Sequence, residues 1–251
     1  MRYQGSKKKM SGVINDLVMK NINGYETYVE PFCGGANSLC AIDFRKKVAN
    51  DTNKYVVAYW NAVKNGEFTE QMWEFVKNLT KEQYYDVKKD YKDGTNRYSD
   101  AVKGYVAFSC SYGGGLWGGY ANYNPKKNEN HILEAYNGAK KQIHNFKYLQ
   151  ETEFHNFDYK ELMSHIDGKC FIYCDPPYTN TKDYKTGFNS DEFWDWCREM
   201  SRNGHFVMVS EYTAPSDFIP IYQKTMQDGM PSVNKGKIEK IFVHESKRHG
   251  F

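Results

Sequence analysis

The segment that most constrains the fold runs from Lys169 to Cys174, an apolar and aromatic stretch typical of a strand buried on both faces. Four residues follow it directly: Asp175, Pro176, Pro177 and Tyr178. In a parallel sheet, residues just beyond the carboxyl end of a strand are the ones that meet ligands. A carboxylate and the carbonyl of a rigid proline can accept both hydrogens of an amino group, and a tyrosine ring offers a flat face to an unstacked base. These residue types favour a site for the exocyclic amine of a nucleobase over a turn merely stiffened by proline.

A second predicted strand, residues 27–30, leads into a turn at residues 31–35 that contains paired glycines. Helical spacing over residues 39–42 follows, and then a short apolar strand at residues 48–49. Paired glycines let the backbone approach a ligand closely, although a plain tight turn explains them equally well. Asp51 follows the later strand, where an acid can bind ribose hydroxyls. The pairing of this acid with the glycine turn favours a nucleoside site.

The remaining strands and helices alternate along the chain. Helical spacing marks residues 14–18 and residues 162–166, and the second of these helices is predicted to end at Asp167-Gly168. Residues 205–209 form another apolar run, which would bring residues 210–212 to the same sheet edge as Asp175. This alternation predicts an α/β fold with a doubly wound, mostly parallel sheet.

A further helix is predicted between the last two of these strands. Ser190 is the expected N-cap, and Gly204 lies just past the expected end. Four residues share the predicted buried face: Phe193, Trp196, Cys197 and Met200. Their helical spacing indicates core packing for the aromatic rings, not contact with a cofactor.

The middle of the chain differs in charge from the rest. Residues 77–150 contain twelve Lys or Arg against seven Asp or Glu, while the whole chain has a net charge of only +3. This stretch includes a glycine-rich aromatic segment, residues 111–120, and an amide- and lysine-rich one, residues 122–128. Such segments suit contact with a nucleic acid, although solubility is the simpler explanation for any single lysine. The candidate contact residues are Tyr112, Trp117, Tyr120, Lys126 and Lys127.

Cysteine usage and hydropathy restrict the class of protein. The six cysteines form no C-x-x-C pair and fall largely within apolar patterns, so we expect buried free thiols and no metal site. No apolar stretch reaches the length of a membrane span, and the N-terminus lacks the apolar core of a signal peptide. The expectation is a soluble cytoplasmic protein in a reducing compartment.

Together these motifs resemble those of the Dam-type DNA adenine-N6 methyltransferases, whose phage and restriction-modification members have similar lengths and carry them in the same order. The segments are Tyr3-Gln4-Gly5-Ser6-Lys7, Glu30-Pro31-Phe32-Cys33-Gly34-Gly35, Asn50-Asp51 and Asp175-Pro176-Pro177-Tyr178. Their shared order is more specific than any one of them. Phe157-Asp158 resembles the segment that meets the adenine of the cofactor, with Asp158-Tyr159 standing where the family usually has Asp-Phe.

The resemblance implies a Rossmann-like, S-adenosylmethionine-dependent catalytic domain at residues 1–56 and 151–251. Residues 57–150 would be an inserted, largely helical DNA-recognition domain. The implied cofactor-binding residues are Tyr3, Lys7, Glu30, Pro31, Phe32, Gly34, Gly35, Asp51, Asp158 and Asp175. A cognate restriction nuclease is the one protein partner that the resemblance suggests.

The implied reaction moves a methyl group from S-adenosylmethionine to the exocyclic amino nitrogen of an adenine flipped out of double-stranded DNA. Asp175 and the Pro176 carbonyl would accept the amino hydrogens, and Tyr178 would hold the ring in position. Pro177 completes the catalytic motif. No covalent enzyme intermediate is required.

Three other functions stay open at this point. The same motif could serve the amino group of cytosine, because the shape of the pocket selects the base. A methyltransferase for protein glutamine usually has Asn at the position of Asp175, so the acid argues against that substrate. An inactive DNA-binding module would be expected to have a broken cofactor motif, and here the motifs are intact. Beyond these three, a purely structural interaction protein is the least favoured function, because it would leave the co-occurrence of the motifs unexplained.

Overall fold

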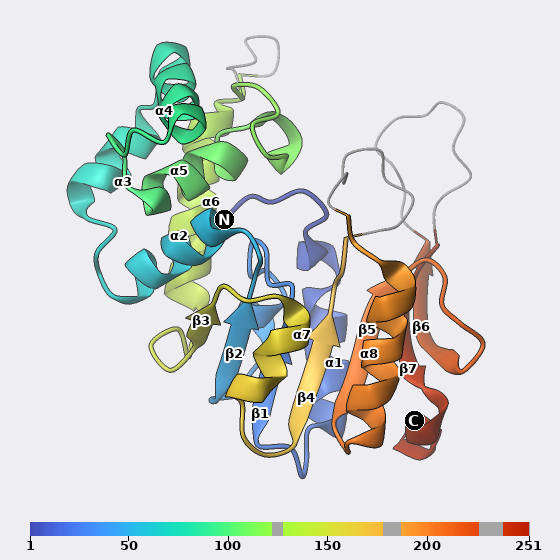
Figure 1. Cartoon of the computed structure of the whole chain (residues 1–251). Coiled ribbons are helices and arrows are strands. Elements are labelled where there is room, and N and C mark those ends of the chain that lie inside the picture. The colour runs from blue at the N-terminus through green and yellow to red at the C-terminus, as the bar shows by residue number, and fades with distance from the viewer. Residues whose placement is uncertain (122–127, 178–186, 226–237, 251) are drawn as a thin grey trace.

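The computed structural model describes residues 1–121, 128–177, 187–225 and 238–250, and a seven-stranded sheet forms its centre (Figure 1). The strands are β1 (Thr27–Glu30), β2 (Lys47–Asn50), β3 (Glu153–His155), β4 (Cys170–Cys174), β5 (Phe206–Glu211), β6 (Phe218–Thr225) and β7 (Ile238–His244). They lie in the order β3-β2-β1-β4-β5-β7-β6. The first five strands in this order are parallel to one another, and β7 is antiparallel to both β5 and β6. The predicted α/β fold with a doubly wound, mostly parallel sheet is confirmed.

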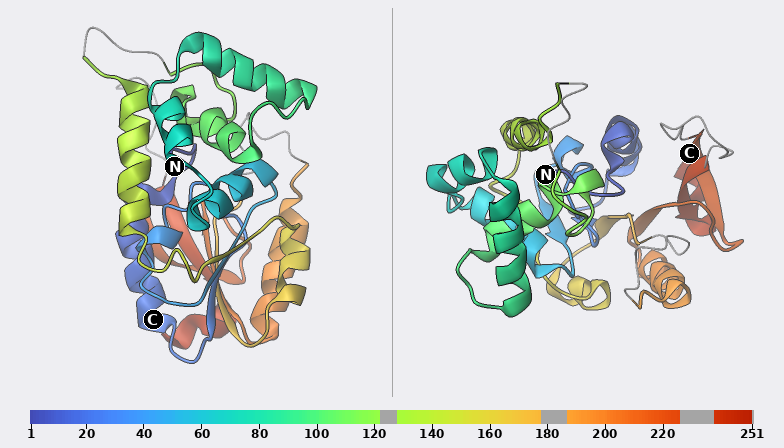
Figure 2. Two further views of the ribbon diagram at one scale, coloured as in Figure 1. Left: turned by 90° about the vertical axis from the view of Figure 1, so that its left-hand side faces the viewer. Right: turned by 90° about the horizontal axis from the view of Figure 1, so that it is seen from above.

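Helices cover both faces of the sheet. They are α1 (Ser11–Asn21), α2 (Lys54–Lys64), α3 (Glu70–Lys77), α4 (Lys81–Asp93), α5 (Asp100–Ser109), α6 (His131–Asn145), α7 (Tyr159–Leu162) and α8 (Ser190–Arg202). Seen from above the carboxyl ends of the parallel strands, α1 lies on one side of the sheet and α7 and α8 on the other (Figure 2). Strands enclosed in this way read as continuous apolar runs, as residues 170–174 do.

The period-two alternation of side chains divides the core between the two faces. Tyr28, Phe171 and Met208 join the cluster that contains α1, whereas Val29 and Ile172 join the cluster under α7 and α8. All four residues predicted for the buried face of α8 are buried. Their helical spacing therefore predicted packing correctly.

Two local predictions were wrong. The spacing over residues 39–42 produces only a single 3-10 turn at Leu39–Ala41, and the chain is extended at Ile42. Ser38 does not cap a helix, because its hydroxyl donates to the Glu30 carboxyl, 3.1 Å away. The N-cap of α8 is Asn189, one residue before Ser190, because its side chain accepts from two backbone N–H groups of the first turn.

The middle of the chain folds into a helical region, α2 to α6, which runs from blue to yellow-green in the upper left of Figure 1. The predicted boundary between residues 56 and 57 falls inside α2. Trp60 of α2 stacks on Phe154 of β3 with ring centroids 5.8 Å apart, so the helical region and the sheet share one apolar core. The division into two domains stays a prediction.

Candidate active site

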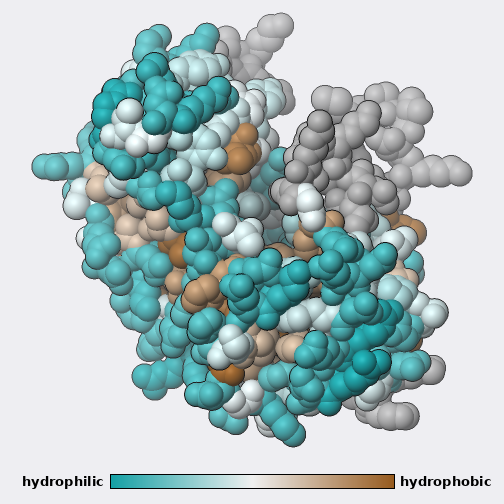
Figure 3. All heavy atoms as spheres, viewed as in Figure 1, coloured by the Kyte–Doolittle hydropathy of each residue, from teal (hydrophilic) through white to brown (hydrophobic). Residues whose placement is uncertain are grey.

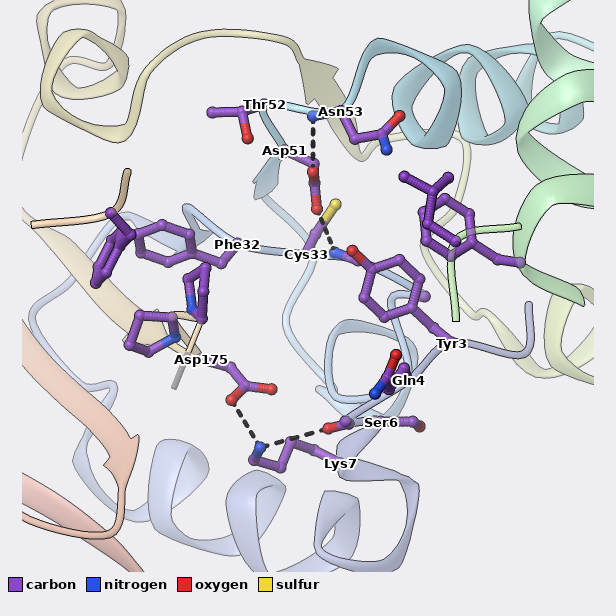
Figure 4. Close-up of a pocket in the computed structure, with 18 of the residues that line it drawn as sticks. Tyr3, Gln4, Ser6, Lys7, Phe32, Cys33, Asp51, Thr52, Asn53 and Asp175 are labelled. Carbon is purple, nitrogen blue, oxygen red and sulfur yellow. Dashed lines mark hydrogen bonds and ion pairs between the residues drawn. The ribbon is translucent and has the colours of Figure 1, made fainter. Parts of the chain in front are cut away.

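The cavity that gathers the predicted site residues lies at the carboxyl edge of the sheet, where the strand order reverses between β1 and β4. Open α/β sheets bind their ligands at such switch points. The cavity has a volume of about 1250 Å³. The predicted site residues that line it are Tyr3, Lys7, Phe32, Gly34, Gly35, Asp51, Tyr112, Asp158, Asp175, Pro176 and Pro177. Figure 4 shows several of them around one space, although Tyr3 and Asp175 are more than 170 positions apart in the sequence.

The other predicted residues lie elsewhere. Glu30 and Pro31 are buried and are absent from the cavity lining. Trp117 and Tyr120 are also absent from the lining. Three further predicted residues lie outside the described part of the chain: Tyr178, Lys126 and Lys127.

Asp51 organises the loop that contains the paired glycines. Its Oδ2 accepts from the Gly34 backbone N–H at 2.9 Å, and its Oδ1 accepts from that of Asn53 at 2.8 Å. The indole N–H of Trp60 donates to the Gly34 carbonyl at 3.2 Å. Burial raises the pKa of Asp51 to about 6, against the effect of the two N–H donors. Both hydrogen bonds hold this carboxylate at the cavity wall.

Asn50 joins the loops that follow β1 and β3. Its side-chain amide donates to the Pro31 carbonyl and to the Phe157 carbonyl, each at 3.0 Å, and its Oδ1 accepts from the Phe157 N–H at 2.8 Å. The next residue along, Asp158, is the N-cap of α7 and lines the cavity. The role of Asn50 in joining these loops was not predicted. The signal for it in the sequence was an amide residue at the end of an apolar strand, and the structure shows that Asn50 is fully buried there.

The N-terminal segment packs against two glycine turns, which explains why glycine is needed there. Gly34 has a φ of +45°, and a Cβ on it would lie 2.8 Å from the Tyr3 ring. On the other side, the Gln4 N–H donates to the Gly114 carbonyl at 2.9 Å, and a Cβ on Gly114 would lie 3.0 Å from the Tyr3 backbone. The Tyr3 ring also packs on Phe108 of α5, with centroids 4.6 Å apart. The glycine-rich loop of the helical region thus touches the predicted cofactor motif.

Lys7 ties the N-terminal segment to the catalytic motif. Its Nζ lies 2.7 Å from Oδ1 of Asp175 and 2.9 Å from Oε1 of Glu239 on β7 (Figure 4 shows the Asp175 contact). Burial by itself lowers the pKa of Lys7, but the two carboxylates outweigh it and the pKa is raised. Lys7 and Asp175 were predicted from their motifs, whereas Glu239 was not, because its position depends on the long-range pairing of β7.

A second buried acid lies behind the cavity wall. Glu30 accepts from the Tyr28 hydroxyl at 2.7 Å and from the Ser38 hydroxyl. Burial raises its pKa to about 8, which the two hydroxyl donors only partly oppose. Glu30 therefore holds a proton through much of the neutral pH range.

One wall of the cavity is aromatic. Phe32 packs on Tyr159, Phe188 and Phe193, with ring centroids 5.3 to 5.9 Å apart. Pro176 and Pro177 complete this apolar side of the cavity. In Figure 3 apolar side chains are visible in the hollow between the helical region and the sheet. Such a wall suits the flat face of a nucleobase.

The glycine-rich loop brings two exposed apolar side chains to the opposite wall. Tyr112 is 70% exposed and Leu116 is 47% exposed, and both line the cavity. Trp117 is only 9% exposed and packs on Tyr84 and Tyr91. The Tyr120 hydroxyl donates to the Leu79 carbonyl at 2.7 Å. Trp117 and Tyr120 thus stabilise the loop from inside.

The six cysteines are free, and all but Cys40 are buried, as expected. Within the described ranges, no three His, Cys, Asp or Glu residues are grouped so as to hold a metal ion. In the same part of the chain, no helix combines the length and apolar character needed to cross a membrane.

A seven-stranded, mostly parallel sheet with a large cavity at its switch point is consistent with a Rossmann-like methyltransferase fold. Residues 3–235 match the model of the D12 class N6 adenine-specific DNA methyltransferases, and the chain belongs to this family. It is thus an enzyme that methylates adenine N6 in DNA at specific sites. This result disfavours the cytosine and the non-enzymatic alternatives.

Individual relatives are distant but extend over most of the chain. Type II methyltransferase M.MjaIII of Methanocaldococcus jannaschii is 24% identical, covering 89% of this chain and 87% of that protein. Type II methyltransferase M1.LlaDCHI of Lactococcus lactis subsp. cremoris is 23% identical, covering 96% and 93%. The DNA adenine methylase of Escherichia coli K12 is 24% identical, covering 78% and 70%. Among solved structures, an rRNA methyltransferase from Streptomyces viridochromogenes matches with a TM-score of 0.45 at 9% identity, covering 97% of this chain and 87% of that one.

Proposed function

We propose that the cavity binds S-adenosylmethionine together with an adenine extruded from the duplex, and that Asp175 activates the amino group of the base. One observation carries this proposal. The Asp175 carboxylate, which forms an ion pair with Lys7, lines the same cavity as the Asp51 carboxylate of the glycine loop. A candidate base-activating acid and a candidate ribose-binding acid therefore share one space.

The residues present fit this cofactor. Asp51 is fixed by two backbone N–H groups, so its remaining lone pairs are oriented for the ribose hydroxyls. Phe32 offers an apolar surface to the adenine ring of the cofactor. It packs on Tyr159, so the neighbouring Asp158 lies close enough to accept hydrogen bonds from that ring. Lys7 and Tyr3 complete the side nearest the N-terminal segment. When bound, the cofactor supplies a methyl group on a positively charged sulfur.

The chemistry required of the protein is to make a poor nucleophile reactive. The amino nitrogen of adenine is conjugated with its ring, and hydrogen-bond acceptors localise its lone pair. Asp175 and the Pro176 carbonyl are such acceptors at the end of β4. As the nitrogen forms its bond to the methyl carbon, the carbon–sulfur bond breaks, and the carboxylate of Asp175 takes the proton that the nitrogen releases. Tyr178 is proposed to hold the ring in line.

DNA is proposed to dock against the glycine-rich loop. Tyr112 is exposed at the mouth of the cavity, next to Leu116, and both can contact bases exposed by flipping. Lys126 and Lys127, a few residues further on, are proposed to bind phosphates. The burial of Trp117 argues for an indirect role of that residue. Tyr120 is proposed to act in the same indirect way.

Two further proposals concern the cellular setting. Because double-stranded DNA is the substrate, we propose a cytoplasmic location. A cognate restriction nuclease stays a prediction.

The decisive experiment is methyl transfer by Asp175→Ala and Asp175→Asn. Labelled S-adenosylmethionine is incubated with duplex DNA, and the nucleosides are then analysed by mass spectrometry. We expect the Ala variant to lose about two to four orders of magnitude in rate and the Asn variant somewhat less. Asp16→Ala, a change of an exposed acid on α1, is the matched control. N6-methyladenine formation by a folded Asp175→Ala protein at the wild-type rate would refute the assignment.

A further inference from the structure

Glu239 occupies an unusual position in β7. Alternate residues of this strand, Ile241 and Val243, are buried in the cluster that contains α1, and Glu239 continues the same face. Its side chain is buried, with 6% of its surface exposed. A carboxylate on an otherwise apolar face is costly unless it is paired, and Glu239 is paired with Lys7 at 2.9 Å.

The ammonium of Lys7 thereby joins two carboxylates from different strands. Asp175 directly follows β4 and Glu239 is the second residue of β7, and β5 lies between these strands in the sheet. Lys7 also donates to the Gly5 carbonyl at 3.4 Å. Contacts from three directions restrict where the ammonium can lie, and the ammonium in turn restricts the Asp175 carboxylate.

We propose that Glu239 is a positioning residue for methyl transfer, which keeps the buried Lys7 charged and in place and so orients Asp175. This inference rests on the proposed role of Asp175. Without Glu239, Asp175 would have to balance the charge of the buried Lys7 ammonium and also receive the substrate amine. A second carboxylate divides these tasks.

Other titratable groups lie close to Lys7, Asp175 and Glu239 and affect how the activity depends on pH. Glu211, at the end of β5, is buried, and its burial together with Asp175 and Glu239 raises its pKa to about 7. Glu30 of β1 and Tyr173 of β4 also interact electrostatically with Asp175. Loss of the Glu239 charge also removes one cause of the raised pKa of Glu211, so the acid side of the pH profile can change for that reason. The alkaline side of the profile, well above the pKa of Glu211, is the part that reports on the Lys7 ion pair.

The test is the single-turnover methyl-transfer rate of Glu239→Gln between pH 6 and pH 10. We expect the rate at pH 7.5 to fall by about 10- to 100-fold, with the affinity for duplex DNA unchanged. The rate should also decline at alkaline pH, by about one pH unit or more earlier than in the wild type, because Lys7 then loses its proton more easily. Glu245→Gln, a change of an exposed acid just after β7, is the matched control.

Several outcomes distinguish the explanations. A folded Glu239→Gln variant with the wild-type rate and pH profile would overturn the proposal, as would a loss of urea stability with an unshifted pH profile. If the Gln variant does not fold, Glu239→Asp replaces it, because a shorter carboxylate should give a smaller shift of the same sign. A wild-type profile in that folded variant would then overturn the proposal. If the proposed function itself fails, Asp175→Ala stays active, whereas failure of this inference alone leaves Asp175→Ala inactive.

Discussion

Replacement of Asp51 by Asn tests whether the organised carboxylate of the glycine loop binds the cofactor. The change keeps the size of the side chain and one oxygen that can accept from Gly34 or Asn53. Its NH2 group is a donor and cannot accept from the other N–H group, so one of the two hydrogen bonds of the loop is lost with the charge. Hydrogen bonds to a charged acceptor contribute about 1.5 to 3 kcal/mol, so affinity for the cofactor should fall about 10- to 150-fold at pH 7.5.

The raised pKa of Asp51 gives this prediction a pH dependence. Its ordinary pKa of 3.8 becomes about 6 in the folded protein, because burial disfavours the charged form. If the cofactor binds only to the charged form of Asp51, its affinity is nearly full at pH 7 and above and is lost as the pH falls through 6. The apparent dissociation constant of the wild type should rise about tenfold from pH 7 to pH 5. In Asp51→Asn this component should be absent.

Calorimetric titration with S-adenosylhomocysteine measures both effects. At pH 6 about half a proton should be released for each ligand bound by the wild type, detectable by comparing buffers of different ionisation enthalpy. Asp16→Asn, on the exposed surface of α1, serves as the control. Wild-type affinity in Asp51→Asn, or an identical pH dependence in the two proteins, would refute the assigned role.

Three further predictions follow from the same structure. Glu30→Gln should reduce the loss of stability with rising pH. The pKa of Glu30 is raised from 4.5 to about 8 in the folded protein, so its contribution to the free energy of unfolding is present below pH 4.5 and is lost as the pH rises to 8, by up to about 5 kcal/mol. Urea midpoints that run parallel in both proteins between pH 5 and pH 9 would contradict this. Gly114→Ala should weaken cofactor binding about tenfold or more. The φ of Gly114 is +73°, and a Cβ there would lie 3.0 Å from the backbone of Tyr3, so the N-terminal segment would have to move. An unchanged affinity in calorimetric titration would show that the segment can shift freely. Replacing Lys126 and Lys127 by Ala should weaken binding to all DNA sequences alike and lower the slope of log affinity against log salt by up to about two units. Fluorescence anisotropy with specific and scrambled duplexes tests this. A double variant that matches the wild type would show that both lysines only keep the loop soluble.

Local patterns were sufficient to predict the parallel part of the sheet. β1, β2 and β4 begin and end within one residue of the predicted runs, and their burial on both faces explains this. The residues just past these strands were predicted with them, because a strand end fixes the sheet edge at which its next residue lies. This is why Asp51 and Asp175 could be assigned to one site before the structure was known.

Short-range competition explains the errors. The spacing of residues 39–42 is compatible with a helix, but Ser38 donates to Glu30 and the chain turns after one 3-10 turn. Tyr112, Trp117 and Tyr120 of the aromatic segment at residues 111–120 were predicted to contact DNA, and this stays a prediction for the segment. The structure divides it between exposed Tyr112 and buried Trp117, because the ring of Trp117 fills space between Tyr84 and Tyr91.

The sequence by itself thus determined the fold class, the strand-end acids and the family. Only the tertiary structure decided which distant groups share the charge of Lys7, that the Gly114 turn packs on the N-terminal segment, and that Asn50 joins two loops. The physical reason is distance along the chain. Apolar periodicity and turn chemistry act over a few residues, whereas the pairing of Lys7 with Glu239 depends on the register of β7 in a sheet built from both ends of the protein.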